Sequence, residues 1–278
     1  MTMDVKTSTR QSGPELGPKM PGFNAGNITR IQQRIETKNR QLLKQPYFQL
    51  CRTKEITRSQ VIDVIKQVYC FSFFFERLLS RRIADSAEGG DARVLAIARH
   101  HLREELGHVS LFQECLSENG VSDRELAQLK PTTFTRAVFG YLLATIQHEN
   151  EYVSNVGMMQ VMETIGSHFF SATLDAMQAH GMAPTGVFQH AQDDEWHATL
   201  GLELLGYVDD RTLCDSERVI DDLYRLMGLM FEEWLGRSVN PRRSVPPPRK
   251  HRSVSPRANW AQVSPRHADS GTGEGFVV

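Results

Sequence analysis

One short stretch near residue 190 constrains most strongly what this chain can fold into. Residues 190–197 read His-Ala-Gln-Asp-Asp-Glu-Trp-His, and no proline interrupts the chain between Thr185 and Asp209. Apolar residues continue beyond the stretch at helical spacing, namely Leu200, Leu204 and Leu205. This periodicity predicts a helix that carries the polar stretch and continues toward residue 209.

Three polar side chains of this stretch share one face of the predicted helix. At about 100° per residue, His190, Asp194 and His197 lie within roughly 60° of one another. Two imidazoles and a carboxylate on one face are nitrogen and oxygen ligands that suit a divalent transition metal. The alternative is a solvated polar face that happens to contain two histidines.

A second pair of such side chains lies in another helical run. Glu105 and His108 are three positions apart, so they share a helix face. Carboxylate-bridged di-iron and di-manganese sites in helical bundles use this Glu-x-x-His spacing. Alone, the spacing is a weak signal because it often arises by chance. Together with the histidines near residue 190, it favours a metal centre.

Glu163 is a third candidate ligand. It lies among apolar residues, in the sequence Met-Met-Gln-Val-Met-Glu-Thr-Ile-Gly of residues 158–166. A carboxylate is costly to bury unless a positive group balances its charge, and a metal ion would do so. Alternatively, Glu163 faces solvent on an amphipathic helix. The two interpretations are about equally supported by the sequence.

Glycine and proline divide the rest of the chain into helical segments. Apolar residues recur at helical spacing between these breaks. Besides the helix near residue 190, the predicted helices cover residues 28–43, 57–85, 92–119, 122–129, 131–180 with a break near 148–149, and 216–234. We therefore predict an all-α bundle of about seven helices. The aromatic run 71–75 is expected in a central core helix, or alternatively in the wall of a substrate cavity, and Glu76 on a polar face.

Both ends of the chain lack a helical pattern. Residues 1–26 are interrupted by proline and glycine, and residues 238–278 are rich in proline, arginine and serine. These compositions predict a disordered N-terminal tail (1–26), one folded domain (27–237) and a disordered C-terminal tail (238–278). The basic C-terminal tail is interpreted as a solvated segment, with a nucleic-acid or membrane role as the alternative.

Composition restricts the partners and the compartment. The net charge of −1 argues against nucleic acid or an anionic membrane as the main partner of the folded domain. The four cysteines contain no Cys-x-x-Cys pair, so they predict neither a disulfide framework nor a zinc site. No secretory signal or membrane-spanning run is found, and we expect a cytoplasmic protein.

The candidate ligands together resemble those of a known family. Glu105-x-x-His108, Glu163 and His190-x3-Asp194-x2-His197 are similar to the pattern of the haem-oxygenase-like di-iron oxidases, over roughly residues 28–237. The resemblance implies a haem-oxygenase-like bundle in which three histidines and three carboxylates hold two iron ions. Carried over position by position, these ligands are Glu105, His108, Glu163, His190, Asp194 and His197, with the adjacent Glu104 as an alternative to Glu105.

The same resemblance implies a function. We expect a non-haem di-iron enzyme that activates O2 as co-substrate, with iron(II) or an iron/manganese pair, in specialised-metabolite biosynthesis. An amino-acid-derived small molecule is the expected substrate, oxidised by N-oxygenation or oxidative C–C cleavage. Oxidative decarboxylation of a fatty acid, a ferritin-like iron-oxidising protein and a metal-free scaffold are the alternatives. By resemblance, the protein is expected to be a homodimer.

Overall fold

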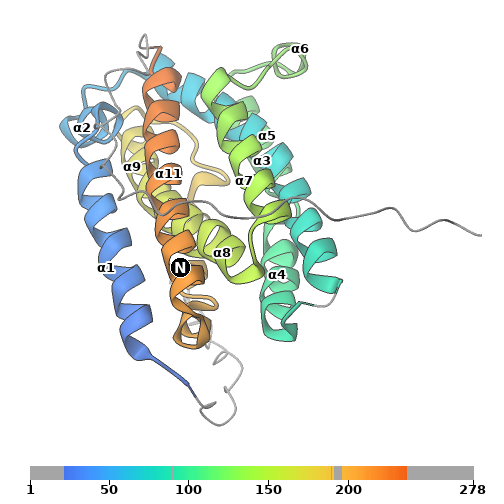
Figure 1. Ribbon diagram of the computed structural model, residues 1–278. Helices are drawn as coiled ribbons and strands as arrows, with labels where there is room; N and C mark the ends of the chain where they lie inside the picture. Colours follow the sequence, from blue (N-terminus) through green and yellow to red (C-terminus); the bar gives the residue numbers. More distant parts are fainter. Residues whose placement is uncertain (1–21, 89, 189, 191–195, 237–278) are drawn as a thin grey trace, which may run out of the picture. The chain divides into compact units, whose positions relative to one another are not determined.

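Helices make up every regular element that the structure describes, which confirms the all-α prediction. The computed structural model describes residues 22–88, 90–188, 190 and 196–236, so most of both predicted tails lies outside the described residues. The elements, in chain order, are α1 (Ala25–Leu42), α2 (Pro46–Thr53), α3 (Arg58–Ala87), α4 (Ala92–Glu105), α5 (His108–Glu118), α6 (Asp123–Leu126), α7 (Thr133–His148), α8 (Glu151–Asn155), the π-helix η1 (Val156–Val161), α9 (Met162–Ala179), the 3-10 helix η2 (Leu202–Tyr207) and α11 (Asp210–Trp234) (Figure 1).

Two long helices organise the core. α11 runs between α1 and α7 and also packs against η1, while α3 packs against α4, α5 and α7 (Figure 1). In α11, Val219, Leu223 and Met230 recur at helical spacing and are buried. Burying a side chain of this size contributes about 1.5–3 kcal/mol, so these faces drive the packing. None of the described helices is long and apolar enough to cross a membrane.

The first helix begins three residues earlier than predicted. Asn24 caps it, because its side chain accepts a hydrogen bond from the Gly26 amide. Asn27, which precedes the predicted start of the helix at residue 28, is buried instead. Its side-chain amide donates to the carbonyls of Leu205 and Val208, at 3.3 and 3.1 Å. This residue therefore ties α1 to the segment around η2.

The predicted helix 92–119 is broken in the middle. α4 ends at Glu105, Leu106 is extended with ψ 123°, and Gly107 has φ 98° before α5 begins at His108. That φ is readily adopted only by glycine, so Gly107 permits the break. The amide of Gly107 donates to Glu76 Oε1 at 3.3 Å. Glu76 thus stabilises the break between the two helices.

The predicted break near residues 148–149 is confirmed, and an irregular helix follows it. α7 ends at His148, and Asn150 caps α8 by accepting from the Val153 amide. α8 continues into η1 and then α9. Short π-helical segments inside α-helices frequently occur at functional sites. Here the π-helix ends two residues before Glu163.

The predicted helix near residue 190 does not continue to residue 209. Residues 198–201 form a turn, and η2 follows as a 3-10 helix. Gly201 has φ 75°, and a Cβ atom there would lie 2.7 Å from Ile97 Cδ1 and 2.8 Å from Asn155 Nδ2. Both the backbone conformation and the close packing therefore require glycine at this position.

Substitution of Gly201 tests how much the fold depends on this turn. Gly201→Ala should reduce the free energy of unfolding by at least about 1–2 kcal/mol, because alanine must adopt a left-handed conformation in contact with two side chains. Gly140→Ala is the matched control, because Gly140 lies in α7 with no atom near its added Cβ. This control should stabilise the protein by about 0.5–1 kcal/mol. Equal effects of the two substitutions in chemical denaturation would contradict the assignment.

Candidate metal centre

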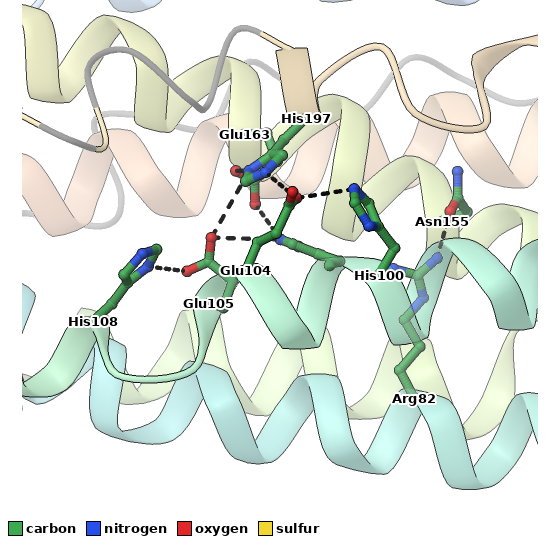
Figure 2. Close-up of polar contacts among 9 residues, drawn as sticks. Arg82, His100, Glu104, Glu105, His108, Asn155, Glu163 and His197 are labelled. Atoms are coloured by element: carbon green, nitrogen blue, oxygen red, sulfur yellow. Dashed lines mark hydrogen bonds and ion pairs between the residues drawn. The ribbon is translucent and has the colours of Figure 1, made fainter. Parts of the chain in front are cut away.

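Six buried side chains from four segments meet between the helices, and Figure 2 shows Glu105, His108, Glu163 and His197 among them. None of them is more than 7% exposed to solvent. The last two turns of α4, the start of α5, the first turn of α9 and the segment before η2 bring them together. They are His101, Glu105, His108, Glu163, His190 and His197.

The first cluster contains His101, Glu105, Glu163 and His197. His101 Nε2 lies 3.0 Å from Glu163 Oε1 and 3.9 Å from Glu105 Oε1. His197 Nδ1 lies 3.4 Å from Glu163 Oε2 and 3.8 Å from Glu105 Oε1. Two ligand atoms that are each about 2.1 Å from one ion can be at most about 4.2 Å apart. All four separations therefore suit a single ion.

The second cluster contains Glu105, His108 and His190. His108 Nδ1 lies 2.8 Å from Glu105 Oε2, and the ring centres of His108 and His190 are 4.2 Å apart. The His190 ring also stacks on Phe170 and Phe112, at 4.4 and 5.2 Å between centroids. Aromatic packing thus holds this imidazole in place.

Glu105 belongs to both clusters. Its Oε1 atom faces His101 and His197, while its Oε2 atom faces His108. Figure 2 shows Glu105 between His197 and His108. The break after Glu105 brings His108 to the second oxygen, since His108 starts a new helix rather than continuing α4. The two oxygens of one carboxylate therefore point toward two separate groups of donors, as a bridging ligand requires.

The structure brings together five of the six predicted ligands. Asp194 lies outside the described residues. Glu163 is buried, so of its two interpretations the structure supports the buried one. His101 is an additional histidine that the prediction missed. Its position four residues before Glu105 was the available signal, because this spacing places both side chains on one face of α4.

Burial and mutual attraction both act on the charges of the first cluster. Burial opposes ionisation of Glu163, but the nearby His101 and His197 outweigh it and lower the pKa of Glu163 to about 2. Burial also opposes protonation of His197, yet Glu163 raises the pKa of His197 to about 9. Without a metal, a proton on His197 therefore balances the Glu163 carboxylate near neutral pH.

The donor atoms fit a metal ion. Among the described residues, neither ring nitrogen of His101, nor Glu105 Oε1, nor His197 Nδ1 makes a well-aligned hydrogen bond. Buried polar atoms are costly unless a partner satisfies them. Imidazole nitrogens and carboxylate oxygens together suit iron or manganese. An ion in the first cluster would satisfy His101 Nε2, Glu105 Oε1 and His197 Nδ1, and it would replace the proton on His197.

Glu104 lies behind the first cluster rather than within it. Its Oε2 atom is 2.7 Å from His197 Nε2 and 3.1 Å from His100 Nε2 (Figure 2). His197 consequently directs its other nitrogen, Nδ1, into the cluster. Metal-bound histidines usually have such a carboxylate on their second nitrogen, which fixes the ring orientation. The geometry therefore favours Glu105 over Glu104 as the ligand.

A buried polar network supports the segment next to His197. The Arg82 guanidinium donates to Asn155 Oδ1 (Figure 2). The side-chain amides of Asn155 and Gln160 both donate to the Leu200 carbonyl. Burial lowers the pKa of Arg82 to about 10, so the group stays positively charged at neutral pH. Its attraction to Glu163 places a fixed positive charge near the buried carboxylates.

An apolar cavity of about 70 Å³ adjoins the clusters. Glu105, Glu163 and His190 form one polar side of the cavity, and Ser72 adds a hydroxyl to its wall. The remaining wall is mainly aromatic and aliphatic, and includes Phe71, Phe75, Ile165, Phe169, Met227 and Phe231. Two rings of the run 71–75 thus line the cavity, and among the described residues of its wall the only charged side chains are the two carboxylates.

Comparison with solved structures identifies the fold. A domain of unknown function with a haem oxygenase-like fold from Shewanella denitrificans OS217 superimposes with a TM-score of 0.65 and 17% identity, covering 75% of this chain and 92% of its own. A TenA homologue from Pseudomonas syringae pv. tomato DC3000 gives 0.63 and 12%, with coverages of 81% and 100%. A CADD-like protein of unknown function from Nostoc punctiforme PCC 73102 gives 0.61 and 14%, with coverages of 76% and 98%.

At these identities the structural similarity establishes the haem oxygenase-like fold alone. No curated protein gives a significant sequence match. Residues 62–229, more than half of the chain, match the model of a protein family whose description is iron-containing redox enzyme. This segment includes all six clustered side chains. The chain therefore belongs to the family of iron-containing redox enzymes, with a haem oxygenase-like fold.

Proposed function

We propose that the protein is a non-haem di-iron oxidoreductase that uses O2 to oxidise a small molecule. The observation that carries this proposal is the buried Glu105 carboxylate shared by two clusters of imidazole and carboxylate donors. A shared carboxylate between two groups of ligands is the arrangement of di-iron and di-manganese centres in helical bundles.

Each side chain has a separate part in this proposal. Glu105, His108, Glu163, His190 and His197 would hold the metal, joined by Asp194, which lies outside the described residues. Bound ferrous iron would supply the electrons that activate O2. Glu104 orients His197, and the apolar cavity excludes water from the side of the centre that a substrate approaches.

The ferritin-like alternative has less support. Paired ferritin-like sites use a Glu from each of two helices and a Glu-x-x-His motif from each of two others, so carboxylates predominate. Here the described clusters contain four histidines and two carboxylates. A metal-free scaffold would leave the buried, unsatisfied donor atoms unexplained. The homodimer and the cytoplasmic location remain expectations from the sequence.

The residues that line the cavity restrict the chemical class of the substrate. The cavity wall favours a substrate that places an apolar group in the cavity, beside the metal centre. Apart from Glu105 and Glu163, the described wall has no charged side chain that could pair with a charged group of the substrate. An amino-acid-derived substrate would therefore direct its amine or carboxylate toward the metal. A fatty acid, oxidised with loss of its carboxyl group, is the second candidate and fits the apolar wall.

Metal content tests the proposed centre. Wild-type protein loaded with iron(II) under anaerobic conditions should bind about two ions per chain. Glu105→Gln should bind far less than half as much, because both clusters lose a charged ligand. Glu114→Gln is the control, because Glu114 is an exposed carboxylate on α5. Elemental analysis gives the result, and wild-type protein without iron under these conditions would rule out the di-iron proposal.

Substitution of Glu104 tests its role in orienting His197. Glu104→Ala should weaken metal binding by about 10–100-fold, the usual effect of removing such a partner. Glu104→Gln should retain most of the affinity, because its side-chain oxygen can still accept a hydrogen bond from His197 Nε2. Competition with a chelator measures both affinities. If Gln and Ala variants lost metal equally and completely, Glu104 would be a direct ligand instead.

Oxygen consumption separates the two substrate classes. Iron-loaded protein should consume O2 when the correct class is added from panels of amino acids and fatty acids. Ile165→Phe reduces the volume of the cavity and should leave the metal content unchanged. It should raise KM by at least about tenfold, which corresponds to the loss of about 1.4 kcal/mol of substrate binding energy. Leu143→Phe, on the exposed side of α7, is the control. Uptake with neither panel would exclude both substrate classes.

A further inference from the structure

The His101 imidazole is buried completely, and its environment differs from that of an ordinary core histidine. It projects from α4 between the Phe75 ring, at 5.8 Å between centroids, and the His197 ring, at 5.5 Å. A buried histidine in a structural role usually donates a ring N–H to an acceptor, and even the half-buried His180 has its Nε2 atom 2.7 Å from the Ile56 carbonyl. Within the described part of the chain, His101 has no such partner on either nitrogen.

The position of His101 is equivalent to that of His197. Both imidazoles direct one nitrogen toward the same two carboxylates, Glu105 and Glu163. The distances from His101 Nε2 are 3.9 and 3.0 Å, and those from His197 Nδ1 are 3.8 and 3.4 Å. A metal ion placed among the four side chains would therefore be within reach of both rings.

We propose that His101 is a fourth histidine ligand of the centre and binds the ion of the first cluster. Among the described residues, two histidines and two carboxylates then hold that ion, while Glu105, His108 and His190 hold the ion of the second cluster. This assignment rests on the proposed metal centre. It departs from the set of three histidines and three carboxylates that the sequence predicts by resemblance.

The competing role for His101 is to position Glu163 by hydrogen bonding. Two substitutions distinguish these roles. His101→Gln keeps an amide N–H that can contact Glu163 but removes the imidazole ligand. His101→Glu removes that donor but supplies a carboxylate, which can bind a metal. If His101 is a ligand, metal binding should be lost in His101→Gln and restored in His101→Glu. If His101 only positions Glu163, metal binding should be retained in His101→Gln and lost in His101→Glu.

The experiment titrates full-length protein with cobalt(II) under anaerobic conditions and follows bound metal and the visible absorption of the ion. Wild type should bind about two ions. His101→Gln should lose one of them, because the affinity for that ion falls by more than about 100-fold. Removal of a group that only hydrogen-bonds to a ligand lowers metal affinity less, by about 10–100-fold. His101→Glu should restore the second ion with a changed spectrum. His148→Gln, an exposed histidine at the end of α7, is the control.

A measurement on unmodified protein does not depend on whether the variants fold. In the cobalt-loaded wild type, each coordinated histidine with a protonated second nitrogen gives a strongly shifted, exchangeable proton resonance. Four such resonances support the assignment, and three overturn it. Two bound ions in both wild type and His101→Gln, at equal affinity, would overturn it while leaving the proposed function intact. No bound ion in wild type would instead remove the proposed metal centre itself.

Discussion

The buried carboxylate of Glu105 is the interaction on which the rest of the site depends. Its two oxygens face different groups of imidazoles, so any displacement of this side chain would separate both clusters. Burying Glu105 and Glu163 together is unfavourable unless positive groups surround them. The imidazoles meet this requirement, and burial of Glu105 is outweighed by its hydrogen bond with His108, which lowers the pKa of Glu105.

The irregular parts of the helices lie around these carboxylates. The break at residues 106–107 brings His108 to Glu105, the π-helix ends just before Glu163, and the turn at residues 198–201 follows His197. Each irregularity interrupts the regular backbone hydrogen bonds of a helix close to the site. Glu76 and the network of Arg82, Asn155 and Gln160 provide replacement hydrogen bonds. Regular helices supply the frame, and their interruptions position the ligands.

The apolar cavity and the clustered side chains form one continuous site. Glu105, Glu163 and His190 belong to both the clusters and the cavity wall, whereas His101 and His197 are away from the cavity. A substrate in the cavity would thus approach the side of the centre that His190 occupies. Membership of the iron-containing redox enzyme family agrees with this arrangement, and the chemistry of the cavity wall restricts which molecules can enter.

The sequence by itself determined the helical class, most helix boundaries and the identity of most candidate ligands, because these depend on local periodicity and residue type. It did not reveal His101, since a histidine beside a polar helix face resembles a solvated one until the facing segments are known. The choice between Glu104 and Glu105 likewise depended on where His197 lies. Only the tertiary structure decided which side chains meet, because the candidate metal site is formed by atoms from α4, α5, α9 and the segment before η2. Packing and glycine-dependent breaks govern how closely these segments approach one another.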